Sequence, residues 1–165
     1  MLSGGDRRSI GRANEAARAI VSGACASRHA VALLLDEDPL IRMRAADALE
    51  KASAHDPGLI QAFRGELVAL LVQTRQQELR WHLARMLPRL ALTESERRRA
   101  FAALKQYLED RSSIVKTCAL DALSRIAAGR SGLEREVLDL LQDAERNGTP
   151  AMRARARRLL KTSFS

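Results

Sequence analysis

A repeat of 36 to 38 residues constrains this chain more than any other feature of its sequence. Four segments align without a gap, and each holds one basic residue in register and a leucine seven residues after it. A fixed period of this length is typical of solenoids, in which a unit buries its apolar face only against its neighbours. The segments are DPLIRMRAADAL from Asp38, QQELRWHLARML from Gln76, SSIVKTCALDAL from Ser112 and TPAMRARARRLL from Thr149.

The composition predicts helices throughout, packed around an aliphatic core. The chain has 165 residues, of which 46% are hydrophobic and only 3% aromatic, and it is rich in the helix formers Ala, Leu, Arg and Glu. Each repeat is therefore expected to form two helices, A and then B, after one leading helix. The expected helices span about 8–22, 27–36, 38–53, 57–73, 75–91, 94–109, 112–128, 132–146 and 150–162.

These helices are expected to form one domain over residues 8–163 after a flexible tail at 1–7, with repeats at about 27–54, 55–92, 93–129 and 130–163. Asp38 before Pro39 has the signature of a helix N-terminus. Pro88 should kink the end of its helix because proline lacks an amide proton, and Gly65 should mark a bend or a close helix crossing.

A polar residue stands six positions before each basic residue of the repeat, in the turn between helices A and B. The pairs are Asp36 with Arg42, Thr74 with Arg80, Asp110 with Lys116 and Asn147 with Arg153. This Asp-to-Arg spacing resembles that of the HEAT-repeat family over residues 27–162, with polar substitutes for Asp in the second and fourth repeats. The resemblance implies a right-handed α-solenoid of about four helix pairs plus the leading helix, in which each basic side chain bonds a turn of its own or the next repeat.

The same resemblance implies that the B helices line the concave face of the solenoid. Proteins of the HEAT type are mostly scaffolds and adaptors, and one bacterial branch removes alkylated bases from DNA. The resemblance itself implies no activity for this chain.

The net charge of +8 is concentrated at the two ends of the chain. Residues 1–28 carry a net charge of +3 and residues 149–165 a net charge of +5, so that residues 29–148 are neutral. The middle repeats therefore do not predict the continuous positive groove that holds a nucleic acid backbone.

Positions counted from the basic residue separate a core face from an outward face on each B helix. Positions −1, +3, +7 and +10 are apolar or small in nearly every repeat and are predicted to be buried. Positions +1, +5 and +8 are predicted to point outward. Position +5 alternates in sign, which suggests either a row of salt bridges between repeats or four separately solvated charges; its residues are Asp47, Arg85, Asp121 and Arg158.

Trp81, the only tryptophan, falls at the outward position +1. An exposed Trp among arginines is typical of binding hot spots, whereas the alternative is that Trp81 packs on Met43 of the previous repeat. The first interpretation predicts a non-enzymatic scaffold that binds a protein partner on its concave B-helix face. The residues assigned to this surface are Met43, Asp47, Trp81, His82, Arg85, Arg89, Asp121 and Arg125.

The last B helix is uniformly basic and is the best candidate for contacting phosphate. Capping of the solenoid explains its polarity but not the single sign of its charge. The alternative function is therefore nucleic-acid binding, with alkylated-DNA repair as one version. The candidate anion-binding residues are Arg153, Arg155, Arg157, Arg158 and Lys161.

The sequence predicts no catalytic site, metal site or cofactor. His29, His55 and His82 have no ligand-like spacing, and neither Cys25 nor Cys118 lies beside a histidine or a second cysteine. No stretch approaches the roughly 20 apolar residues of a membrane span, and the start of the chain lacks an apolar signal segment. We therefore expect a cytoplasmic protein whose oligomeric state and partner the sequence leaves open.

Overall fold

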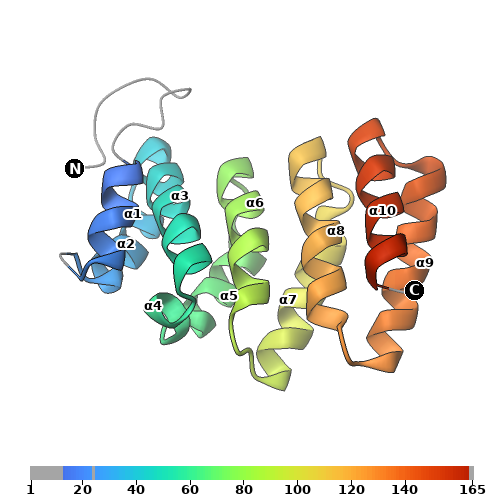
Figure 1. The fold of residues 1–165 in the computed structure, drawn as a ribbon. Coiled ribbons are helices and arrows are strands. Elements are labelled where there is room, and N and C mark those ends of the chain that lie inside the picture. The colour runs from blue at the N-terminus through green and yellow to red at the C-terminus, as the bar shows by residue number, and fades with distance from the viewer. Residues whose placement is uncertain (1–12, 24, 164–165) are drawn as a thin grey trace. The chain divides into compact units, whose positions relative to one another are not determined.

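The computed structural model describes residues 13–23 and 25–163, and within these residues all regular structure is helical, with no strand (Figure 1). The all-α prediction is therefore confirmed. The described residues form two compact units, one ending at Leu92 and the other beginning at Thr93, where the third repeat was expected to start. The expected tail at 1–7, and the part of the leading helix before residue 13, lie outside the described residues.

In the first unit, three helices lie side by side, and shorter segments connect them and pack against them (Figure 1). The three are α1 (Ala13–Val21), α3 (Pro39–His55) and α6 (Gln77–Met86). The shorter segments are α2 (Ser27–Ala32), the 3-10 turn η1 (Leu33–Leu35), α4 (Gly58–Gln61), α5 (Arg64–Gln73) and the 3-10 turn η2 (Leu87–Arg89). Helix α2 packs against α3, and α5 packs against α6. Each expected B helix of this unit is thus paired with the A segment before it.

The second unit contains two further helix pairs. Its helices are α7 (Glu94–Tyr107), α8 (Ser113–Ala127), α9 (Ser131–Asn147) and α10 (Pro150–Ser163). Helices α8 and α10 pack against each other, α7 packs against α8, and α9 packs against both (Figure 1). All four helices match the expected spans to within two residues.

The second repeat departs from a regular helix at two points. The expected helix at 57–73 is broken at Ala62 and Phe63, ahead of the predicted bend at Gly65, because Phe63 leaves the helical region with φ −99° and ψ 9°. Pro88 acts as predicted. Helix α6 ends at Met86, and the chain continues as a 3-10 turn that contains the proline.

The four predicted core positions of the B helices are buried with few exceptions. In the second repeat (α6 and the segment after it) and in α8 all of them are buried, and in α3 and α10 only Ile41 and Leu160 are partly exposed among the described side chains. Leucine and alanine fill most of these positions, so the packed face is aliphatic as the composition indicated. The outward side of each B helix is therefore the side opposite these buried positions.

Candidate functional site between α3 and α6

The basic residues of the repeat hold the turns through backbone carbonyl groups. Arg42 donates to the carbonyl oxygen of Asp36 at 2.7 Å and to Oε1 of Gln76, at the start of α6, also at 2.7 Å. Arg80 donates to the carbonyl oxygen of Thr74 at 3.0 Å. Arg42 thus bonds both its own turn and the next repeat. Among the described contacts, Lys116 and Arg153 have no equivalent side-chain bond to a turn.

The side chain of the turn residue bonds the backbone of its own turn in the first three repeats. Asp36, Thr74 and Asp110 each accept a hydrogen bond from the amide two residues later, at 2.9, 3.3 and 2.8 Å. Such turns need only a side-chain oxygen, which Thr supplies as well as Asp. Asn147 does not share this role, because its side chain donates to Asp143 inside α9.

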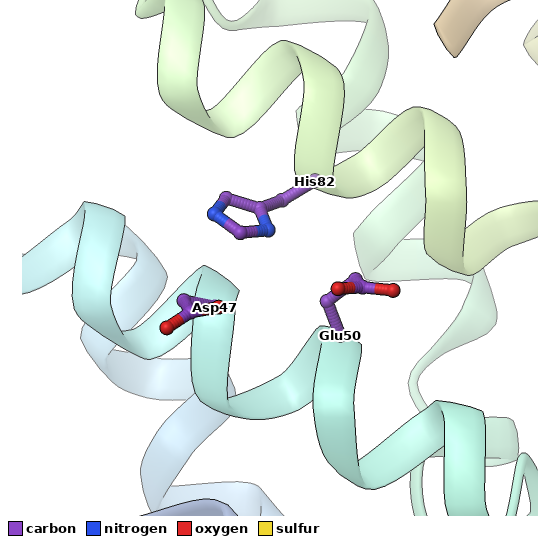
Figure 2. Close-up of side chains that lie close together, drawn as sticks. All are labelled: Asp47, Glu50 and His82. Carbon is purple, nitrogen blue, oxygen red and sulfur yellow. The ribbon is translucent and has the colours of Figure 1, made fainter. Parts of the chain in front are cut away.

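Three potential ligand groups meet between α3 and α6, inside the first unit. Asp47 and Glu50 lie one turn apart on α3, and His82 reaches them from α6 with its ring directed toward the two carboxylates (Figure 2). One ligand atom from each residue lies within 4.8 Å of the others. The sequence analysis missed this cluster because the two α3 residues and His82 are far apart in the chain. We call these three residues the α3–α6 cluster.

Three cations surround the carboxylates of the cluster. Lys51 donates to Oδ2 of Asp47 at 2.7 Å, and Arg89 donates to Oε1 of Glu50 at 2.6 Å. Arg85 approaches the same Oε1 atom at 3.4 Å. Arg89 also donates to the carbonyl oxygen of Glu50 and to the hydroxyl of Ser53, at 2.7 and 2.8 Å. Arg89 therefore ties the end of α6 to α3.

His82 is the most deeply buried member of the cluster, with only 2% of its surface exposed. Burial first, and then the charges of Arg85 and Lys51, lower the pKa of its imidazole from 6.5 to about 3. The ring is therefore neutral at physiological pH. Its Nδ1 atom has no hydrogen-bond partner among the described residues, which is unusual for a buried polar atom.

Two residues assigned to the exposed partner surface are not exposed. His82 is buried, and the side chain of Arg89 is largely enclosed by its bonds to Glu50 and Ser53. The reason is that His82 on α6 and Arg89 in the η2 turn after it both reach toward α3 instead of outward. Trp81 is partly exposed and lies against the ring of His82, with the two ring centroids 3.4 Å apart. Met43 is also partly exposed.

The predicted salt-bridge row along position +5 is wrong in its pairing. Asp47 pairs with Lys51 of its own helix, and Arg85 approaches Glu50. In the second unit, Asp121 pairs with Arg155 at 2.6 Å instead of with Arg158, one turn away. Position +8 is also not outward on α3 and α8, since Glu50 is only 5% and Ser124 only 6% exposed.

Helix α10 presents most of its basic residues to solvent. Arg155 is partly buried and forms an ion pair with Asp121, whereas the other four candidate anion-binding residues are exposed. These four are Arg153, Arg157, Arg158 and Lys161. Arg125, on α8 in the same unit, is exposed as well.

No protein-family model matches this chain, and no curated protein sequence matches it significantly. Among the described residues, no helix is long and apolar enough to cross a membrane.

Proposed function

We propose that this chain is a non-enzymatic binding module with a HEAT-like α-solenoid fold, and that it docks a protein partner on the outward face of α3 and α6. The observation that carries the proposal is the partial exposure of Trp81 beside Arg85, whose side chain is 50% exposed. Tryptophan and arginine are the residue types most enriched where binding energy is concentrated.

The chemistry of this face favours a partner segment with one apolar side chain and one carboxylate. Trp81 and Met43 supply partly exposed apolar surface on adjacent helices. Arg85 has only a long contact of 3.4 Å with Glu50, which Arg89 already neutralises at 2.6 Å. Arg85 can therefore turn toward an acidic group of a partner without leaving Glu50 unpaired.

Affinity capture from the source cell tests this proposal. The immobilised chain is compared with Trp81→Ala and Arg85→Glu, and with Arg99→Glu as a matched control, because Arg99 is exposed on α7 in the other unit. Proteins kept by the control and lost by both α6 variants are then purified. We expect Trp81→Ala to weaken their binding by about 30-fold, as for a hot-spot residue.

Circular dichroism of each variant separates loss of binding from loss of structure. Arg85→Glu changes an exposed side chain and should fold normally, so it remains informative if Trp81→Ala unfolds. Identical sets of captured proteins for the original chain, Arg85→Glu and folded Trp81→Ala would refute the proposed surface.

The exposed arginines of α10 support nucleic-acid binding as the alternative function. Arg157 and Arg158 are exposed and have no acidic partner among the described residues. Phosphate contacts make affinity fall steeply with salt, so anisotropy titrations of DNA and RNA at several salt concentrations test this function directly. Absence of binding at low salt would eliminate it. A glycosylase assay on alkylated DNA tests the repair version separately.

A further inference from the structure

We propose that Asp47, Glu50 and His82 bind a divalent transition-metal ion of the Zn²⁺ type, which joins α3 to α6. The three side chains already converge, with one ligand atom from each within 4.8 Å of the others (Figure 2). Two ligands come from one helix and the third from its neighbour. An ion at this point would therefore be a structural clamp inside the first unit, which goes beyond the proposed partner binding.

The imidazole of His82 is the observation that points to a ligand. The residue is 2% exposed, its ring is directed at the carboxylates, and its Nδ1 atom has no hydrogen-bond partner among the described residues (Figure 2). Buried polar atoms without a partner are rare, because their desolvation is not compensated. A metal ion bound at Nδ1 would supply the missing partner.

In the second unit, the equivalent contact between neighbouring B helices is an ion pair. His82 and Arg155 occupy position +2 of their B helices, and Asp47 and Asp121 occupy position +5 of the preceding ones. In the second unit, Arg155 donates to Asp121 at 2.6 Å, so that a positive charge sits directly on the carboxylate. His82 brings no charge of its own to Asp47, whose ion pair comes from Lys51 of the same helix at 2.7 Å. A bound cation would add the charge contact between the two helices that Arg155 provides in the second unit.

The surrounding cations leave ligand atoms available. Lys51 contacts Oδ2 of Asp47, and the closest contacts of Arg85 and Arg89 are both to Oε1 of Glu50. Among the described contacts, no hydrogen bond or ion pair is made to the second oxygen of either carboxylate, which is the atom that a metal ion would bind. Lys51 is the competitor on Asp47; its side chain is 35% exposed and also donates to Oδ1 of Asn14 at 2.7 Å, so it keeps one partner if a metal ion displaces it from Asp47. Arg89 would remain on Glu50.

The donor set selects the class of metal ion. A neutral imidazole with two carboxylates suits Zn²⁺ and its neighbours, whereas Mg²⁺ and Ca²⁺ prefer oxygen ligands alone. Zn²⁺ binds nitrogen and oxygen at about 2.0–2.2 Å, so the ligand atoms must move closer together on binding. Small side-chain rotations of Asp47 and Glu50 achieve this. Water would complete the tetrahedral coordination.

Zinc titration of the full chain in competition with a chromophoric chelator tests the proposal. The protein is prepared without a histidine tag and stripped of metal. We expect one equivalent of Zn²⁺ to bind and Mg²⁺ to leave the signal unchanged. His82→Gln should weaken binding at least tenfold, whereas His29→Gln, the matched control at an exposed histidine, should leave it unchanged. Lys51→Met should strengthen binding several-fold, because one competing positive charge is removed.

Two further measurements keep the test decisive if His82→Gln does not fold. In the original chain, Zn²⁺ should shift the imidazole ¹⁵N resonances of His82 and raise the melting temperature. Equal affinity of folded His82→Gln and the original chain would overturn the proposal. So would the absence of zinc binding in both the original chain and Lys51→Met, or zinc binding that leaves the His82 resonances unmoved.

Discussion

Acidification from pH 7 to pH 5 should destabilise the first unit through protonation of His82. Burial, followed by the charges of Arg85 and Lys51, lowers the pKa of this imidazole from 6.5 to about 3 in the folded chain. The groups that face the ring are the carboxylates of Asp47 and Glu50, both already paired with cations, Lys51 from α3 and Arg89 from η2. They therefore do little to stabilise an additional positive charge on the ring.

The sign and size of the effect follow from proton linkage. Between about pH 6.5 and pH 3, the unfolded chain binds a proton on His82 that the folded chain does not bind. Stability must therefore fall as the pH falls through this window. A pH of 5 lies about 1.5 units below the pKa of 6.5 that the imidazole has in the unfolded chain. Each of these pH units lowers the free energy of unfolding by about 1.4 kcal/mol. The free energy of unfolding should thus drop by about 2 kcal/mol between pH 7 and pH 5.

Urea unfolding followed by circular dichroism, in the presence of a chelator, measures this loss. His82→Gln removes the titrating group. His29→Gln is the matched control, because it removes the imidazole of an exposed histidine. The original chain and His29→Gln should each lose about 2 kcal/mol more than His82→Gln between the two pH values. Taking the difference between variants cancels the titration of all other groups. The urea m-values should remain equal, which shows that the unfolded states are comparable.

The reasoning would be refuted by an equal pH dependence in the original chain and His82→Gln. That result would mean that the folded chain accommodates the imidazolium. The pairing of Lys51 with Asp47 would then have to give way to a pairing of His82 with Asp47.

Two more substitutions test how the helices of the first unit are held together. Arg89→Met leaves the carboxylate of Glu50, which is 5% exposed, with only the distant Arg85, and should cost about 3 kcal/mol of unfolding free energy in a urea titration. Arg42→Met removes the bonds to its own turn and to the next repeat and should cost about 1–2 kcal/mol, whereas Arg153→Met, at the equivalent exposed position of α10, should cost less than about 0.5 kcal/mol.

The buried stripe of the B helices could be predicted from the sequence because it depends on helical periodicity alone. Apolar residues at spacings of three and four share one face of a helix. That face is buried, whichever neighbouring element covers it. Leu79, Leu83 and Leu87 illustrate this, since all three are buried as expected. The break at Phe63 was not predictable in the same way, because no proline or glycine stands at that point.

The turns show a recurring pattern whose bonded atoms the sequence does not specify. The spacing of six between Asp36 and Arg42 led to the prediction that the basic side chain bonds a turn, without an acceptor atom. In the structure the arginine bonds a carbonyl oxygen, and the Asp side chain accepts from the amide two residues on. A backbone acceptor is present whatever the residue is, which explains why Thr74 can replace Asp while Arg80 keeps its bond. Sequence spacing locates such a contact but does not identify its acceptor.

The candidate site was missed because contacts between neighbouring B helices are offset along the repeat. At 100° per residue, position +2 lies about 95° from the centre of the core face, on the flank toward the preceding helix. His82 and Arg155 are at this position, and both meet a carboxylate at position +5 of that helix, Asp47 or Asp121. An alignment that compares +5 with +5 cannot reveal such pairs. Comparing +2 of each repeat with +5 and +8 of the one before it does, and it identifies His82 as the residue that brings no charge to its carboxylate.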